Sequence, residues 1–321
     1  MKTSPAPVAG IDYPRNLQEF DRVFADEAAC RSYLFRVRWP EGYQCFRCRN
    51  KTPPWITSRG YLHCRECGGE ISITSGTVFE RTRKPLRVWF QAMWLVVTSQ
   101  KHGASALGLQ RVLGLGSYQT AWTWLHKLRR AMVRPGRERL HGSVEVDETY
   151  VGGEEKGGKR GRGTENKDVV VIAVEVLPPK GFGRIRMGRV PNVSGDSLVP
   201  FICEVVEPGS KILTDGWSGY NSLSGHSYTH VRTVLSESGD PAHVAMPAVH
   251  RIAALLKRWL LGIHQGAVSS KHLEYYLDEY TFRFNRRTSR SRGMLFYRLM
   301  QQAVATPSTP YRQLVDGNHK I

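Results

Sequence analysis

Three carboxylates stand within one short stretch of a strongly basic chain. The segment SVEVDETYVGG, residues 143–153, carries Glu145, Asp147 and Glu148, and its first two acids alternate with valines as on a β-strand. A further acid, Asp215, ends the apolar segment KILTDG. If the two strands are neighbours, their aspartates reach one point in space. The plainer alternative is an acidic pair that is salt-bridged or solvated.

Paired carboxylates repel each other unless a cation lies between them. Mg²⁺ takes oxygen ligands and keeps water or substrate phosphate in its other positions. Two such ions about 4 Å apart hold the attacking and leaving oxygens of a phosphodiester. The pair therefore predicts a divalent-metal site for phosphodiester chemistry, in a chain whose basic surface holds the nucleic acid.

The charge balance favours the same class of partner. The 321 residues include 46 Lys and Arg against 28 Asp and Glu, a formal net charge of +18, and the pI is near 9.9. This excess favours a polyanion, most simply nucleic acid. A membrane surface is disfavoured, because no basic helix has a strongly apolar face. No apolar run is long enough to span a bilayer and no secretory signal is present, so we expect a cytoplasmic protein.

Four of the six cysteines have the spacing of a zinc ribbon. Cys45, Cys48, Cys64 and Cys67 form two C-x2-C pairs separated by fifteen residues. Each pair makes a tight turn that directs both sulfurs to one centre. Four thiolates leave no open coordination position, so we predict a structural Zn²⁺. A redox pair and a chance spacing are the alternatives.

The region between the ribbon and the first acidic strand is predicted to be helical. One apolar helix begins near Pro85, and residues 105–132 contain two helices broken at Gly114–Gly116. This pattern resembles a helix-turn-helix, and a purely structural helical hairpin is the alternative. The second helix ends in basic residues that we expect to contact DNA: Lys127, Arg129 and Arg130.

From residue 143 the periodicity predicts the order strand, strand, strand, helix, strand, strand, helix. That order suits an α/β fold with a mixed sheet flanked by helices. We expect five segments: a helical lead-in at 1–44, the zinc ribbon at 45–84, a helical DNA-binding module at 85–133, a catalytic domain at 143–305 and an irregular tail at 306–321.

These motifs together resemble a known family. The ribbon, the helical module, VEVDETYVGG, LTDGWSGY and LLKRWLLGIHQGAVSSKHLEYYLDEYTFRFNRR follow one another as in bacterial insertion-sequence transposases. The chain is similar to the zinc-ribbon-bearing group of the DDE superfamily, the insertion sequence fifteen-ninety-five group, over about residues 15–305. The resemblance implies a ribonuclease-H-like catalytic domain and metal-dependent DNA strand cleavage and joining. Asp147 would be the first acid and Asp215 the second.

The chain departs from the superfamily at the third position. The superfamily usually has Glu about 35 residues after the second Asp and Lys seven residues later, and here those positions hold His250 and Lys257. Members of this group are similar in allowing Asn or His, so the resemblance implies His250 as the third ligand, a donor that suits Mn²⁺ better than Mg²⁺. Lys257 would contact a phosphate. Glu237 and Asp240 in the preceding loop are the alternatives for the third position.

Further residues complete the predicted site. Glu145 lies on the same strand face as Asp147 and is a weaker candidate for a supporting role, whereas Glu148 points the other way and is interpreted as structural. The basic, Gly-rich loop at 156–167 is expected to order on DNA. The segment FNRRTSRSRG, residues 284–293, is predicted to contact phosphates through arginines that include Arg286, Arg287 and Arg290.

These inferences predict a transposase of an insertion sequence. The ribbon and the helix pair would bind the terminal repeats, and double-stranded DNA would be the partner at the element end and at the target. Asp147, Asp215 and His250 would hold Mg²⁺ or Mn²⁺, and the working complex would be a homo-oligomer associated with the bacterial nucleoid. The alternatives are a non-enzymatic zinc-ribbon regulator with a decayed catalytic site, and a nuclease or Holliday-junction resolvase on the same fold.

Overall fold

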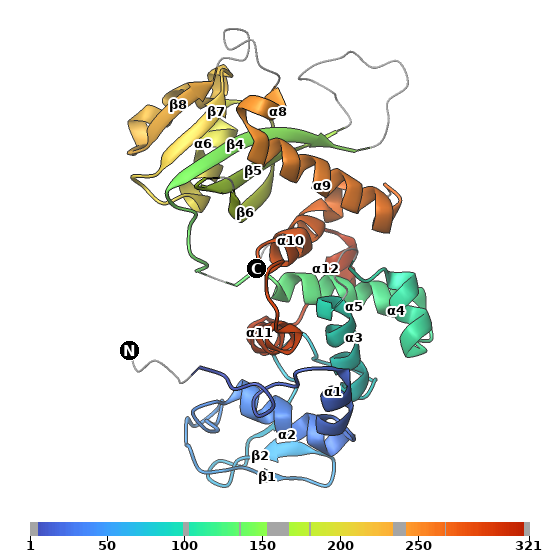
Figure 1. Cartoon of the computed structure of the whole chain (residues 1–321). Coiled ribbons are helices and arrows are strands. Elements are labelled where there is room, and N and C mark those ends of the chain that lie inside the picture. Colours follow the sequence, from blue (N-terminus) through green and yellow to red (C-terminus); the bar gives the residue numbers. More distant parts are fainter. Residues whose placement is uncertain are drawn as a thin grey trace. The chain divides into compact units, whose positions relative to one another are not determined.

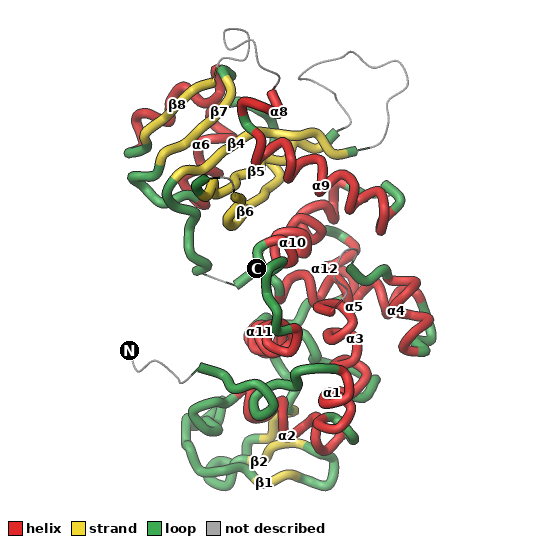
Figure 2. Tube along the Cα trace, viewed as in Figure 1, coloured by secondary structure: helices red, strands yellow, loops and turns green. Residues whose placement is uncertain are grey.

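The computed structural model describes residues 6–98, 103–134, 136–152, 167–179, 181–233, 242–266 and 268–317. The chain divides into two compact units. The helical unit consists of residues 1–134 and 289–321, and the sheet unit consists of residues 135–288. Figures 1 and 2 show the elements of each unit.

A five-stranded mixed sheet forms the centre of the sheet unit, with the strand order β6-β5-β4-β7-β8. The pairs β4–β5 and β5–β6 are antiparallel, whereas β4–β7 and β7–β8 are parallel. The strands are β4 Ser143–Val151, β5 Asp168–Leu177, β6 Gly181–Val190, β7 Lys211–Asp215 and β8 Thr229–Thr233.

Helices cover both faces of this sheet (Figure 1). One apolar core joins Val144 and Val146 of β4 to α6 and the 3₁₀ helix η1. A second core, on the opposite face, joins Ile172 of β5 to α9 and α10. β5 is a nearly continuous apolar run because helices cover it on both sides. The helices of this unit are α6 Gly195–Val205, η1 Ser218–His226, α8 Ala242–Ala245, α9 Pro247–His264, η2 Ser270–His272 and α10 Leu273–Phe284.

The element order of the sheet unit confirms the predicted order of three strands, a helix, two strands and a helix. It also confirms the predicted α/β class with a mixed sheet flanked by helices. The reason is local, because each strand is a short β-branched run and each helix has an apolar stripe at helical spacing.

The helical unit contains seven helices among the described residues. Side chains of Asn16, Asp26, Ser105, Ser117 and Ser291 accept backbone N–H bonds and so begin five of them. The helices are α1 Leu17–Val23, α2 Glu27–Arg38, α3 Leu86–Thr98, α4 Ala106–Leu113, α5 Tyr118–Ala131, α11 Arg292–Ala305 and α12 Tyr311–Val315.

The predicted helix pair is present as α4 and α5. Gly114 ends α4 with φ of 59°, a left-handed conformation that glycine adopts without the strain of a side chain. Ser117 then caps α5 by accepting a bond from the N–H of Thr120. The turn and the start of the second helix therefore lie where the sequence predicts them.

The ribbon has little regular structure (Figure 2). Three short antiparallel strands, β1 Trp55–Ile56, β2 Tyr61–His63 and β3 Glu70–Ser72, make up its sheet. Its buried cluster contains only Tyr43, Leu62 and two cysteines, with a few partly buried neighbours. So small a core needs another source of stability, as metal-bound small domains generally do.

The C-terminal part of the chain differs from the prediction. The expected catalytic domain extends to residue 305, but the structure assigns α11 to the helical unit and ends the sheet unit at residue 288. The reason is an aromatic core in which Phe296 of α11 packs against Phe20, Phe24 and Phe90. The tail is not wholly irregular either, because α12 contacts α5 and buries Leu314.

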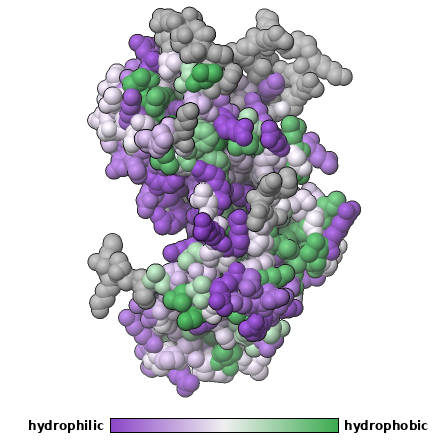
Figure 3. Space-filling model, in the orientation of Figure 1, coloured by the Kyte–Doolittle hydropathy of each residue, from purple (hydrophilic) through white to green (hydrophobic). Residues whose placement is uncertain are grey.

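Across the described ranges, no helix combines the length and the apolar character needed to cross a membrane. Figure 3 shows polar residues over most of the visible surface, with apolar residues in small separate groups.

Candidate active site and metal centre

The sheet topology brings Asp147 and Asp215 to equivalent positions. β4 and β7 are parallel neighbours, and Glu145 pairs with Leu213 in their register. Asp147 and Asp215 each stand two residues further along, so continuing the register places them side by side where the paired strands end. The predicted neighbourhood of the two strands is therefore correct.

Both aspartates face the side of the sheet that α9 covers. Val144 of β4 and Ile212 of β7 belong to the core under α6, and side chains alternate between faces along a strand. Asp147 and Asp215, each separated from those residues by an odd number of positions, therefore point to the opposite face. Asp147 also pairs with Ile172, which belongs to the core under α9.

His250 reaches Asp147 from α9. The Nε2 atom of His250 lies 3.9 Å from Oδ2 of Asp147, and the two side chains are 34% and 17% exposed. The Oδ1 atom of Asp147 accepts the N–H of Glu148 at 2.9 Å, and Oδ1 of Asp215 accepts the N–H of Trp217 at 3.0 Å. These backbone bonds orient the two carboxylates.

Glu145 fastens the start of α9 to β4. Its Oε2 atom accepts the N–H of Val249 at 2.9 Å, and Ala248 also donates a backbone bond to it. Burial raises the pKa of Glu145, and these two donors oppose that shift. A carboxylate at a helix N-terminus satisfies N–H groups that have no partner within the helix. Because His250 is the next residue after Val249, this bond sets the height of His250 above Asp147.

Replacing Glu145 by Ala is expected to lower the free energy of unfolding by about 1–3 kcal/mol, because the buried N–H of Val249 loses its acceptor. Gln keeps an acceptor, so Glu145→Gln is expected to lose less. Urea denaturation at pH 7 measures both variants, and equal losses would contradict the capping role.

The pH dependence of the stability difference between the wild type and Glu145→Gln is the control for this prediction. A raised pKa means that the folded state favours the protonated carboxyl. The contribution of Glu145 is therefore greatest below its unfolded-state pKa and declines as pH rises through the folded-state pKa. The stability of the wild type relative to Glu145→Gln is expected to fall across that window, which extends upward from the usual pKa of Glu.

Glu148 faces away from this site, as predicted. Its Oε2 atom accepts the hydroxyl of Tyr220 at 2.8 Å, and Tyr220 is fully buried. Burial raises the pKa of Tyr220 well above its usual value, and the nearby charges of Glu148, Asp147 and Asp215 raise it further. The hydroxyl therefore stays protonated and links β4 to η1.

Of the remaining predicted site residues, the structure describes Lys257 but not the loop residues. Lys257 is on α9 two turns beyond His250, on an exposed stripe with Ala254. Desolvation lowers the pKa of Lys257, and the like charge of Lys167 lowers it further. The alternatives Glu237 and Asp240, and nearly all of the basic loop at 156–167, lie outside the described residues.

The four cysteines of the ribbon converge. The Sγ atoms of Cys45 and Cys67 are 3.7 Å apart, and so are those of Cys48 and Cys64. A tetrahedral Zn²⁺ with Zn–S bonds of about 2.3 Å separates its sulfurs by about 3.8 Å, whereas a disulfide needs about 2 Å. Backbone N–H groups of Cys48 and Arg47 lower the pKa of Cys45 to about 6, which favours the thiolate. The cluster fits zinc.

Among the described residues these cysteines are the one group of three or more His, Cys, Asp or Glu that the structure gathers closely enough to hold a metal ion, and their ligand atoms all lie within 4.8 Å of one another. Asp147, Asp215 and His250 provide the oxygen and imidazole donors that Mg²⁺ or Mn²⁺ accepts.

The predicted DNA contacts of α5 need correction. Arg129 and Arg130 are only 2% and 6% exposed, because α11 and α12 pack against α5. They are therefore not surface phosphate contacts. Lys127 remains partly accessible and lines a surface cavity.

The arginines after α10 make contacts within the sheet unit. Arg286 stacks on Phe282 with 4.1 Å from its guanidinium to the ring centre. Arg287 stacks on Phe284 at 3.9 Å and donates to the carbonyls of Phe182 and Gly183. Arg290 is exposed, so its predicted phosphate contact stays a prediction.

Sequence reasoning missed the capping role of Glu145. Its partner Val249 is 104 residues away, and no local pattern encodes that contact. The alternation of Glu145 with the valines of β4 was the only available signal, and it indicates the face of the strand but not the partner.

Comparison with known proteins gives one match in the ribbon and one in the sheet unit. Residues 139–285 match the ISXO2-like transposase domain, and residues 25–70 match the transposase zinc-ribbon domain. A protein of the transposable element ISH50 from Halobacterium salinarum is 28% identical over 283 residues, covering 82% of this chain and 92% of that protein. A transposase-like protein from Haemophilus influenzae is 29% identical over 112 residues, covering 35% of this chain and 89% of that protein.

The two family matches correspond to structural features already described. The zinc-ribbon match includes all four cysteines, and the transposase-domain match contains Asp147, Asp215 and His250. Its last residue, 285, lies close to the end of the sheet unit at residue 288. The chain therefore belongs to the insertion-sequence transposases in which a transposase zinc-ribbon domain precedes an ISXO2-like transposase domain.

Proposed function

We propose that this transposase binds the ends of its element and catalyses metal-dependent cleavage and joining of DNA strands. The observation that carries the proposal is the placement of Asp147 and Asp215 at matching positions on adjacent parallel strands, with His250 of α9 3.9 Å from Asp147. Two carboxylates held in this way, in a chain of net charge +18, suit a cation that faces DNA.

We infer that the sheet unit is a ribonuclease-H-like catalytic domain. Three antiparallel strands lead into two parallel strands, in the order that the family resemblance implies. The first strand, β4, lies at the centre of the sheet and carries Asp147. Asp147 lies two residues beyond Glu145, the last residue of β4 paired with β7, and Asp215 is the last residue of β7.

Each residue has a distinct part in the proposed reaction. Asp147, Asp215 and His250 hold divalent ions, and Glu145 fixes the height of His250. When bound, the ions neutralise phosphate charge and lower the pKa of water. Lys257, two turns further along α9, contacts a phosphate of the donor or the target strand.

The reaction takes place at one site as a hydrolysis followed by a transesterification. Water attacks the phosphodiester at the element end, and the bond to the leaving 3′-oxygen breaks to free a 3′-hydroxyl. That hydroxyl then attacks a target phosphodiester, joining the element to the target and displacing a second 3′-oxygen. The protein mainly positions the reacting groups and balances charge.

The helical unit supplies DNA binding in this proposal. Its zinc ribbon and its α4–α5 pair hold the double-stranded terminal repeats, and a homo-oligomer brings two element ends together. The protein acts in the cytoplasm, where the cell's DNA is accessible.

A strand-joining assay tests the proposal. Labelled duplexes taken from the DNA that flanks the gene are incubated with zinc-loaded protein, with and without Mg²⁺ or Mn²⁺. Omitting the ion is preferable to adding a chelator, because a chelator also strips the ribbon. Joined products that require the ion are expected, and more product with Mn²⁺ is expected from the imidazole donor.

The other outcomes distinguish the alternatives. Cleavage without any joined product would indicate a nuclease or a resolvase. Tight, ion-independent binding without products would indicate a regulator with a decayed site.

A further inference from the structure

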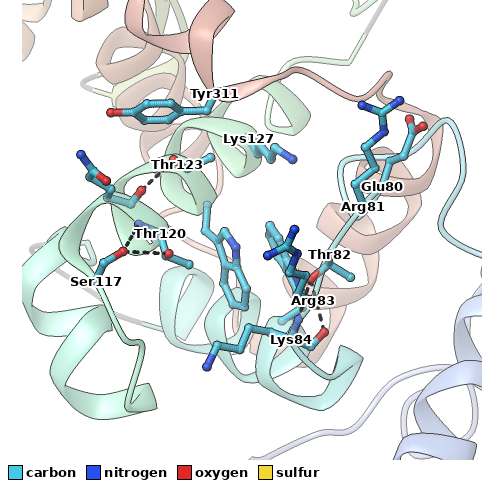
Figure 4. A pocket seen from close by; sticks show the side chains of 13 residues that line it. Glu80, Arg81, Thr82, Arg83, Lys84, Ser117, Thr120, Thr123, Lys127 and Tyr311 are labelled. Carbon is cyan, nitrogen blue, oxygen red and sulfur yellow. Dashed lines mark hydrogen bonds between the residues drawn. The ribbon is translucent and has the colours of Figure 1, made fainter.

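A cavity of about 450 Å³ opens on the helical unit beside α5 (Figure 4). One wall consists of residues 80–84, which precede α3, and the other is one side of α5. The lining residues are Glu80, Arg81, Thr82, Arg83, Lys84, Trp89, Ser117, Gln119, Thr120, Thr123, Trp124, Lys127 and Tyr311.

The cavity is strongly cationic. Arg81, Arg83, Lys84 and Lys127 line it against a single carboxylate, Glu80. Within the described part of the chain, none of the four cations forms a salt bridge. Burial lowers the pKa of Lys127, and the charge of Glu80 only partly opposes that shift. A concave site that gathers four positive charges without pairing them attracts an anion.

The wall formed by residues 80–84 is held in a fixed shape. The hydroxyl of Thr82 accepts the indole N–H of Trp89 at 2.8 Å and the backbone N–H of Lys84 at 3.2 Å. Trp89 stacks on Trp124 of α5, with ring centres 3.7 Å apart. The aromatic pair therefore ties this segment to α5, so the cations on both walls keep their spacing.

The backbone conformation of Arg81 also indicates that the wall formed by residues 80–84 has a fixed shape. Arg81 has φ of 58°, in the left-handed region that a residue with a side chain seldom adopts. Such conformations persist where the surroundings impose them, and they concentrate at binding sites. Arg81 and the three residues that follow it all line the cavity.

The α5 wall adds two threonine side chains and one lysine ammonium group to the lining. Thr120, Thr123 and Lys127 follow one another at helical spacing and line the cavity. Figure 4 shows Lys127 and Tyr311 on one side of the cavity and Arg83 and Lys84 on the other. Hydroxyl, ammonium and guanidinium groups are the side chains that contact phosphate and sugar in DNA complexes.

We propose that this cavity clamps the phosphodiester backbone of duplex DNA, with Arg81, Arg83, Lys84 and Lys127 as the phosphate-contacting residues. The inference rests on the proposed function in that DNA is the substrate, and it names the surface that holds it. The clamp acts on the backbone, so it binds DNA of any sequence and places α5 against the groove. It replaces the predicted contacts by the buried Arg129 and Arg130.

Salt dependence of duplex binding provides the test. Each lost phosphate contact is expected to reduce the slope of log Ka against log salt by about 0.9, which is about eightfold in affinity near 0.1 M salt. The variants are Arg83→Gln, Lys84→Gln and their combination, measured by fluorescence anisotropy on an element-end duplex and on a random duplex. Both duplexes are expected to lose affinity equally.

Two further variants sharpen the test. Glu80→Gln removes the only carboxylate of the lining and keeps an acceptor for the N–H of Gly76, so it is expected to tighten binding severalfold. Arg22→Gln on α1 is the matched control, because Arg22 is exposed and lies outside the cavity. It is expected to leave the slope unchanged. Zinc content and thermal unfolding verify that each variant is folded.

The outcomes separate the clamp from the proposed chemistry. Unchanged slopes in the folded double variant, or a loss confined to the element-end duplex, would overturn the clamp. A wild-type protein that binds neither duplex would overturn it as well. A wild type that shows the expected slopes on random DNA but never joins strands would support the clamp and refute the proposed catalysis.

Discussion

Changing Asp215 or Asp147 to Asn is expected to reduce strand cleavage and joining at least about a thousandfold, while duplex binding stays within about twofold. A thousandfold loss corresponds to about 4 kcal/mol of transition-state stabilisation, which is the order expected when a ligand that holds a charge-neutralising metal ion is removed. Asn keeps the size of the side chain and loses the charge. Joined product is quantified on gels, and affinity is measured on the same duplex.

The neighbouring Glu148 is a matched control for this experiment. It lies next to Asp147 on β4 but points to the other face, where it accepts the hydroxyl of Tyr220. Glu148→Gln keeps that acceptor and is expected to retain activity within about tenfold. Strand joining by Asp215→Asn at a rate near that of the wild type would contradict the site assignment.

Changing Cys64 to Ser is expected to abolish zinc binding and to unfold the ribbon while the sheet unit stays folded. Structural zinc contributes about 10–16 kcal/mol in small zinc domains at neutral pH, and the ribbon has a small core and short strands. Zinc content is expected to fall from one ion per chain to none. Amide hydrogen exchange is expected to lose protection at β2 and β3 but not at β4.

Cys203 offers the control for that change. It is one of the six cysteines, but it lies in α6 of the sheet unit, whereas the ribbon belongs to the helical unit. Cys203→Ala is expected to keep one zinc per chain and normal exchange in the ribbon. If Cys64→Ser retained zinc, or if the ribbon amides of the metal-free wild type stayed protected from exchange, zinc would have no structural role.

These two expectations depend on features that the sequence already indicates. The C-x2-C spacing fixes the direction of each cysteine pair through a local turn, and the structure brings the four sulfurs together. Asp215 ends β7 as the apolar run before it predicts, whereas Asp147 lies in the middle of β4, because that strand continues to Val151. Local patterns of this kind are visible in sequence because they involve neighbours along the chain.

The third site residue shows where local reasoning stops. A count of residues suggests His250, but only the packing of α9 across the sheet brings it within 3.9 Å of Asp147. The bond from Val249 to Glu145 sets that position, and its partners are 104 residues apart. Glu145 therefore changes from a weak supporting candidate to the residue that anchors α9.

The expected DNA contacts of α5 show the same limit of local reasoning, because two residues predicted to be accessible are buried. Arg129 and Arg130 end a polar helix and look accessible in sequence, yet they are buried. The helices that cover α5 come from residues 292–315, beyond the whole sheet unit. No sequence pattern near α5 predicts that residues 292–315 pack against it. The same return moves the end of the sheet unit from the expected residue 305 to residue 288.

The sequence by itself determined the element order, the grouping of the four ribbon cysteines and the family of this protein, and it predicted the two aspartates, because each depends on spacing between near neighbours. Only the tertiary structure decided which carboxylate holds α9, which arginines are buried and which basic residues surround the cavity beside α5. Those outcomes depend on contacts between segments far apart in the chain, and contacts of that kind form only when the core of each unit packs.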